Sequence, residues 1–223
     1  MSNKYQRELH GPGWGEVILG ALLSFILGVV LAMAFLIFTP VEKVKAMPKE
    51  PKPKVVYYLE GNALSGRAGQ AQSKAKAFLQ GKSVVLNEDE LNALATGFSK
   101  KRGTGKPAAN PENAIENGTP NFRIHDGVLQ VGVPLEISTY GLTREVILQA
   151  RGGFTKSGDT FVFDPTEVYV GSCPIERLPM LQGMIFDRLI AVAELPEGVP
   201  AAWQKLSDVA VDGSTLRLTA ATP

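Results

Sequence analysis

The chain has 223 residues, of which 44% are hydrophobic and 20% are charged, and its formal net charge is +1. After Lys54 it carries 16 basic and 18 acidic residues, so this part lacks the basic surface typical of nucleic-acid-binding proteins, and no nucleic-acid partner is predicted. The single cysteine, Cys173, excludes an intrachain disulfide and a cysteine-based zinc site.

The first predicted element is a membrane-spanning helix over residues 17–38, after a tail of residues 1–16. This run, VILGALLSFILGVVLAMAFLIF, is uncharged and would be about 33 Å long as a helix, enough to cross a bilayer. A cleaved signal peptide has an apolar core of only about 7–15 residues and ends in a small-residue cleavage site. Here the run is longer and ends in Thr39-Pro40, so we predict a retained anchor.

Small residues recur at every fourth position of this run, at Gly20, Ser24, Gly28 and Ala32. They share one helix face, where two backbones can approach closely. The pattern favours an interface with a second copy or with another membrane protein. The alternative is that these residues are simply frequent in membrane helices.

Residues 39–54 are rich in proline and lysine, which is typical of a stiff spacer next to lipid headgroups. Five lysines in this region, against Lys4 and Arg7 before the helix, would place the C-terminal domain in the cytoplasm by the positive-inside rule. Long domains, however, translocate largely regardless of charge. We therefore predict a cytoplasmic (inner) membrane protein with an extracytoplasmic domain.

Residues 55–223 have the size of one α+β domain. Residues 55–59 and 83–86 resemble short strands, and residues 65–80 and 88–98 are predicted helices. Asn87 and Glu90 have the spacing of a capping box at the start of the second helix. The polar stretch 99–121 is predicted to be a flexible loop.

The strongest β pattern begins after this loop. Residues 122–125 and 128–138 flank the hairpin turn Asp126-Gly127. In the second strand, the apolar face holds Leu129 and alternates with a face containing Gln130 and Gly132, which predicts one face on a core and one in water. Residues 146–154, 161–163 and 168–170 continue the pattern, with the last two broken by Asp164-Pro165. The result is an antiparallel β-meander packed on helices.

A broadly apolar helix is predicted over residues 176–194, followed by a short helix over residues 201–206 and a closing hairpin around Asp212-Gly213. Four residues of the long helix would line an apolar groove against the sheet: Met180, Met184, Ile185 and Leu189. Such a groove would bind lipid or another apolar ligand. The alternative is an ordinary core between sheet and helix.

Catalytic and metal-binding patterns are missing from the sequence. The two histidines, His10 and His125, form no metal-binding pair, and no nucleophile-elbow motif is present. Adjacent residues on a strand point to opposite faces, so His125 and Asp126 are not expected to converge. We predict no enzymatic activity, no metal and no cofactor. The alternative, a hydrolytic enzyme, requires that folding bring His125 near a carboxylate in a cleft.

The order of elements resembles that of small single-pass bacterial envelope proteins of the YpmS type and, more loosely, of anchored lipid-binding-like envelope proteins. The resemblance rests on the membrane helix, the segment Asn87 to Asn92, the hairpin Ile124 to Leu129 and the strand Val146 to Phe154. It implies an extracytoplasmic α+β domain and no site residues. The sequence thus predicts a non-catalytic binding or scaffolding module whose partners are membrane lipids and a membrane protein or a second copy.

Overall fold

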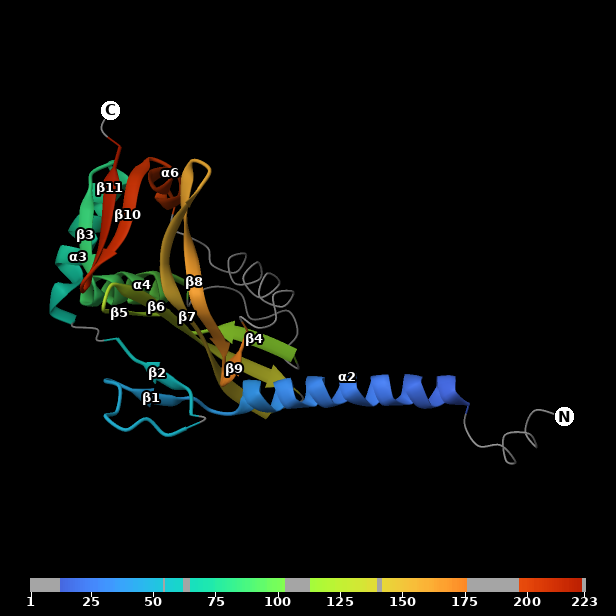
Figure 1. The fold of residues 1–223 in the computed structure, drawn as a ribbon. Coiled ribbons are helices and arrows are strands. Elements are labelled where there is room, and N and C mark those ends of the chain that lie inside the picture. The colour runs from blue at the N-terminus through green and yellow to red at the C-terminus, as the bar shows by residue number, and fades with distance from the viewer. Residues whose placement is uncertain are drawn as a thin grey trace.

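The computed structural model describes residues 13–53, 55–61, 65–102, 113–139, 142–175 and 197–221. One long apolar helix projects from a body of antiparallel sheets and short helices (Figure 1). The predicted α+β class is confirmed. The elements are α2 (Trp14–Phe38), β1 (Glu42–Val44), β2 (Tyr57–Leu59), η1 (Ser65–Arg67), α3 (Ala68–Leu79), β3 (Val84–Asn87), α4 (Glu88–Arg102), β4 (Asn113–Asn117), β5 (Asn121–His125), β6 (Val128–Thr139), β7 (Leu142–Ser157), β8 (Thr160–Val170), β9 (Cys173–Pro174), α6 (Val199–Trp203), β10 (Leu206–Asp212) and β11 (Thr215–Ala220).

Helix α2 has 25 residues and is long and apolar enough to cross a membrane. At about 1.5 Å per residue it is about 37 Å long, or about 7 Å longer than a typical hydrocarbon core of about 30 Å. None of its residues is fully buried in the protein. Within the part of the chain that the structure describes, its contacts with the body lie at the C-terminal end, where Met33, Ala34 and Ile37 are half-buried.

The large sheet has the strand order β4-β6-β7-β8-β9, and β5 pairs with one part of β6. All its neighbouring strands are antiparallel, as predicted. Asp126 and Gly127 both have positive φ in the predicted β5–β6 turn. Strand β8 runs through Asp164-Pro165, where a break was predicted. A bulge in β8 leaves Thr166 without a register partner between Arg151 and Gly152 of β7 and accommodates the proline. On its other side, β8 pairs with β9 only through Tyr169 and Val170.

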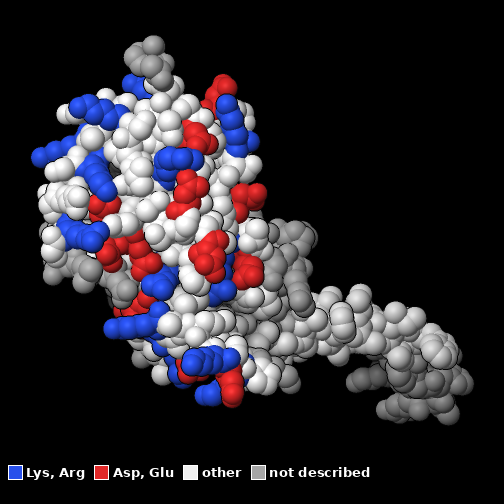
Figure 2. Space-filling model, turned by 60° about the vertical axis from the view of Figure 1, so that its left-hand side comes forward, with Lys and Arg blue, Asp and Glu red and all other residues white. Residues whose placement is uncertain are grey.

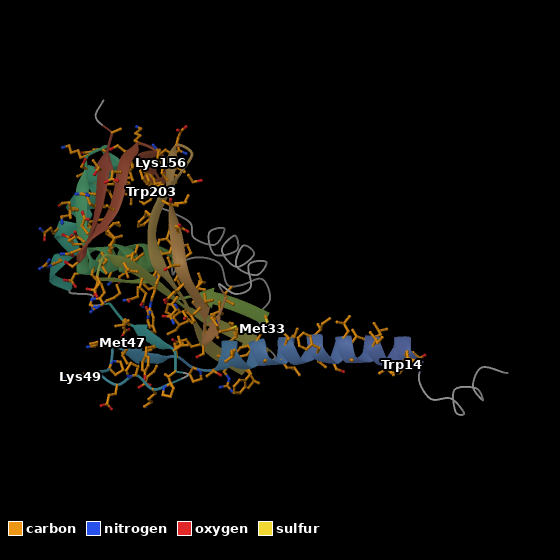
Figure 3. All side chains as sticks on the ribbon, in the orientation of Figure 1. Trp14, Met33, Met47, Lys49, Lys156 and Trp203 are labelled. Carbon is orange, nitrogen blue, oxygen red and sulfur yellow. The ribbon has the colours of Figure 1, made fainter. Side chains whose placement is uncertain are left out.

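A smaller sheet has the order β10-β11-β3 and covers one end of the large sheet. Side chains from both sheets, α3 and α6 form the main apolar core, which includes Phe78, Leu129, Phe161 and Leu218. Trp203 of α6 donates a hydrogen bond to the Phe161 carbonyl at 2.7 Å. This core therefore joins the two sheets at the end of the molecule far from α2 (Figure 3).

The predicted capping box at the start of α4 is confirmed. The Glu90 backbone N–H donates to Asn87 Oδ1 at 2.9 Å, and the Asn87 N–H donates to the Glu90 carboxylate at 3.0 Å. The Lys74 ammonium donates to the same buried carboxylate at 2.7 Å. Asn92 connects α4 to β5, because its amide exchanges hydrogen bonds of 2.7 and 2.8 Å with the backbone of Phe122.

Two segments predicted to be irregular contain regular structure. Residues 39–54 include β1, which pairs in parallel with β2. Of residues 99–121, the first four continue α4, residues 113–117 form β4, and Asn121 begins β5. Residues 118–120 have no regular structure, and residues 103–112 of the predicted loop lie outside the described residues.

Candidate functional site

The candidate site is the junction at which α2 meets the large sheet. Met33 and Ile37, one helical turn apart, pack against a small apolar core from the sheet that includes Leu148, Val168 and Ile175. Figure 3 shows Met33 at the domain end of α2, where the strands reach the helix. Cys173 is buried in this core, where its thiol acts as a small apolar side chain.

The turn after β8 completes this contact by hydrogen bonding to the end of α2. The Ser172 N–H donates to the Leu36 carbonyl, and Ser172 Oγ donates to the Thr39 carbonyl, each at 3.1 Å. The Leu36 carbonyl also accepts from the Thr39 N–H at 3.2 Å, so the domain adds a second hydrogen bond to this helix-terminal oxygen and one to the carbonyl of Thr39, the residue that follows the helix. Gly171 has a φ of +58°, and a Cβ there would collide with the Ile37 carbonyl. Only glycine allows this approach.

The opposite face of the sheet is covered by β1 and β2. Gln130 Nε2 donates to the Leu59 carbonyl at 2.9 Å, and Arg151 Nε donates to Gln130 Oε1 at 2.9 Å. The Tyr58 ring lies against Gly132, where a Cβ would collide with it. The prediction that the Gln130 and Gly132 face is in water is therefore wrong at these positions, because the segment after α2 folds back and buries it.

Two polar groups in this covered layer have unusual environments. Burial, with a smaller contribution from the charge of Glu60, raises the pKa of the Tyr58 phenol above its ordinary value. The Tyr58 hydroxyl lies 3.2 Å from Asn121 Oδ1, which also accepts from the Gly61 N–H at 2.7 Å. Gln149 is only 1% exposed, and neither polar atom of its side chain has a hydrogen-bond partner in the described structure.

An apolar groove lies beside this junction, between the last turns of α2 and the paired ends of β6 and β7. It has a volume of about 790 Å³, within the range of about 300–1,000 Å³ typical of ligand pockets. Among the described residues that line it, the one charged residue is Arg144, which pairs in register with Ile137. We call it the junction groove, and its lining residues are Ala34, Phe35, Phe38, Thr39, Pro40, Ile137, Leu142 and Arg144.

A second, more polar hollow of about 220 Å³ lies on the β1–β2 side of the sheet. Lys43, Tyr58, Glu60 and Asn121 are among its lining residues. Lys43 is ion-paired with Glu145, and both side chains are about half-exposed, so this pair contributes little to stability. The described residues that line it include no histidine or cysteine, and the hollow is too small for most organic ligands.

Of the residues predicted from the sequence to form sites, some lie on α2 and others lie outside the described residues. Gly20, Ser24, Gly28 and Ala32 lie along an exposed face of α2, and nothing approaches within 4 Å of a Cβ built on Gly20 or Gly28. The predicted apolar groove of Met180, Met184, Ile185 and Leu189, with its helix over residues 176–194, lies outside the described residues. His10 lies outside them too.

The prediction that His125 and Asp126 do not converge is wrong. His125 Nε2 lies 3.3 Å from Asp126 Oδ2, because Asp126 is a turn residue with a φ of +52° and does not follow strand alternation. The two side chains are 69% and 85% exposed, and they lie on the surface rather than in a cleft. In the part of the chain that is described, no group of three or more His, Cys, Asp or Glu residues has the arrangement of a metal site.

No family model, no curated protein and no solved structure matches this chain. The resemblance to envelope proteins of the YpmS type therefore stays a prediction. The sequence did not indicate the junction groove, whose lining comes from two segments separated by about 100 residues. One signal was available: Leu142 and Arg144 lie two residues apart, which would place an apolar side chain beside a cation on one face of a strand.

Proposed function

We propose that this protein is a single-pass, non-catalytic membrane protein whose domain is held in a fixed orientation against the bilayer as a binding or scaffolding module. The observation that carries the proposal is the covering of both sheet faces by consecutive segments of the chain. Met33 and Ile37 pack on one face, while β1 and β2 hydrogen bond to the other. A flexible tether would make neither contact.

The length of α2 places the junction at the membrane surface. If the hydrocarbon core begins near Val17, a span of about 30 Å ends near Leu36. The last turn of α2 would then lie among the headgroups, together with the ends of β6 and β7 beside it. Trp14 would lie at the other interface, where tryptophan is enriched. The domain would thus touch the membrane rather than stand away from it.

The remaining surface of α2 is available for a partner within the membrane. At about 100° per residue, Ala32 lies about 150° around the helix from the centre of the docking face of Met33, Ala34 and Ile37. The small residues Gly20, Ser24 and Gly28 continue from Ala32 on the side turned away from the domain. We propose that this face contacts a second copy or another membrane protein.

Substitution of Gly28 tests this contact. Gly28→Leu would block close approach of two helices and lower crosslinking or co-purification of the partner. Leu27→Val, on a different side of the helix, is the control. Equal association of the wild type and Gly28→Leu would contradict the proposed interface.

We also propose that the protein is in the cytoplasmic (inner) membrane with its domain outside the cytoplasm. The support is the retained anchor and the weak influence of flanking charge on the translocation of long domains. Reporter fusions at the C-terminus test this directly. Alkaline phosphatase activity is the expected result, and activity of a cytoplasmic reporter would overturn the assignment.

The fixed orientation is tested by spin labels at two ends of β7, in the full chain reconstituted in lipid vesicles. Leu142→Cys marks the end beside α2, where the native side chain is 69% exposed, and Lys156→Cys marks the far end. The label at 142 should be accessible to membrane-dissolved oxygen, and the label at 156 to a water-soluble relaxation agent. Equal access of both labels to the water-soluble agent would contradict the proposal.

A further inference from the structure

The junction groove combines an apolar lining with a single cation. Most of its wall comes from Phe35, Phe38, Ile137 and Leu142, and Arg144 is the only charged residue among the described residues that line it. The apolar face of the sheet leads into it, because Ile137 and Arg144 lie on the same face as Leu148 and Ala150, which pack against α2. The groove thus continues the docking surface beyond the point where α2 covers it.

Arg144 is free to bind an anion. Its side chain is exposed, and among the described residues no carboxylate forms an ion pair with it. The neighbouring Glu145 points to the opposite face of the sheet and pairs with Lys43 there. The charge of Arg144 is therefore compensated neither from its own strand nor from the residues that share the groove.

The apolar and charged parts of the groove are ordered along β7. Leu142 is the first residue of the strand, and Arg144 follows two residues later, about 7 Å farther from the hairpin end. An amphiphile lying along the strand would place its apolar part against Leu142 and Phe35 and its anionic part at Arg144. A free phosphate or an apolar peptide would use only one of these parts.

We infer that the junction groove binds one anionic phospholipid of the surrounding leaflet. The acyl chain lies against Phe35, Phe38 and Leu142, and the phosphate accepts hydrogen bonds from the Arg144 guanidinium, whose planar donors suit phosphate oxygens. This inference rests on the proposed placement of the junction at the membrane surface. At that depth, lipid is the molecule that surrounds α2, and an apolar groove there is filled by hydrocarbon rather than by water.

The test is native mass spectrometry of the full chain, purified in detergent and mixed with equal amounts of palmitoyl-oleoyl phosphatidylglycerol and the matching phosphatidylcholine. The wild type should retain one phosphatidylglycerol in preference to phosphatidylcholine. Arg144→Gln should lower retention of phosphatidylglycerol about tenfold, the size expected for the loss of a charge-assisted hydrogen bond. It should lower retention of phosphatidylcholine less, because the choline ammonium already neutralises that phosphate, and the preference should fall accordingly. Lys156→Gln removes an exposed cation at the far end of the same strand and should leave the preference unchanged.

A second variant tests the apolar part of the groove. Leu142→Gln should lower retention of both lipids, because it places a polar side chain against the acyl chain, whereas the exposed Val162→Gln on β8 should not. Circular dichroism melting of each variant checks that it is folded. Because Leu142 and Arg144 are exposed, melting temperatures close to that of the wild type are expected.

Three results would overturn the inference: equal retention of the two lipids by the wild type, an unchanged preference in Arg144→Gln, or an equal loss in Lys156→Gln. The last would indicate general attraction of anionic lipid to surface charge. If the spin label at 142 still reports membrane contact, only the lipid site is wrong. If that label reports water instead, the proposed orientation fails with it.

Discussion

The two faces of β7 are covered by adjacent segments of one chain, but by opposite kinds of contact. On one face, Leu148 and Ala150 meet Met33 and Ile37 of α2 through apolar packing. On the other, Arg151 and its neighbour Gln130 hydrogen bond to the carbonyls of Tyr57 and Leu59. The chain passes from one face to the other within residues 38–42.

This difference separates two requirements of the junction between α2 and the large sheet, namely attraction and a fixed position. Apolar packing is not directional, so it supplies attraction but tolerates small shifts of the helix over the sheet. Hydrogen bonds between buried polar groups fix a register, since a shifted arrangement leaves them without partners. We infer that the apolar face holds α2 on the domain and that the polar face sets the position of the segment that follows it.

The largest expected effect is that of Gly171→Val, which disrupts the packing of α2 on the apolar face of the sheet. A β-branched residue at a φ of +58° is strained, and its Cβ would collide with the Ile37 carbonyl. We expect a loss of stability of about 3 kcal/mol and detachment of α2 from the sheet. Thermal unfolding in detergent and the spin label at 142 measure the two effects.

Gly158→Val is the matched control for this substitution. Gly158 has a similar φ of +61°, but nothing lies within 4 Å of its Cβ position. It shares the backbone strain without the collision. If both variants lower the free energy of unfolding equally and the spin label at 142 stays in contact with the membrane in both, the junction does not depend on the close approach of Gly171 to α2.

Gly132→Ala tests the polar side in the same way. The added methyl group would collide with the Tyr58 ring, which belongs to β2 and is buried against the sheet. We expect a loss of about 2 kcal/mol, as is typical of overpacking, together with faster proteolysis within residues 45–56. Gly153→Ala, in the same sheet but with open space around it, is the control. Equal effects of the two substitutions would argue against close packing of β2 on the sheet.

Gln149→Met sharpens the contrast between the faces, because it makes the polar face more like the apolar one. The buried side-chain amide of Gln149 has no hydrogen-bond partner in the described structure, so its burial destabilises the fold. Removing its amide should raise the free energy of unfolding by about 1 kcal/mol in denaturant melts. Gln130→Met should do the opposite, since it removes two hydrogen bonds. A similar loss in both variants would contradict this account.

The smallest effect concerns pH. Because the pKa of Tyr58 is raised in the folded state, the unfolded chain loses this proton first. The contribution of Tyr58 is constant below the unfolded pKa of about 10 and is lost as the pH rises above it. Tyr58→Phe should therefore reduce the decline of stability between neutral pH and about pH 11, measured by denaturant melts. A decline equal to that of the wild type would contradict the burial of the ionisable hydroxyl.

Local patterns predicted much of the fold. The uncharged run, the Asn87–Glu90 capping box and the Asp126-Gly127 turn each rely on residues close in sequence. The junction between α2 and the large sheet was not predictable in this way. It depends on Ser172 reaching Thr39, which is 133 residues away, and on a lysine- and proline-rich segment that buries polar residues of a sheet. The alternation in β6 placed Gln130 on the polar face of the strand. A polar face can lie in water or can form hydrogen bonds with a covering strand, and the alternation does not distinguish the two.

The separation between Ser172 and Thr39 also sets an order of assembly. During synthesis, α2 can enter the membrane and β1 can pair with the nearby β2 long before Ser172 has been made. The bonds that close the end of α2 therefore form late, after β6, β7 and β8 are available to receive it, and long-range contacts of this kind are slow to form. Until then the membrane helix and the growing sheet are joined only by the chain between them, and conditions that slow this last step should expose the apolar end of the sheet to aggregation.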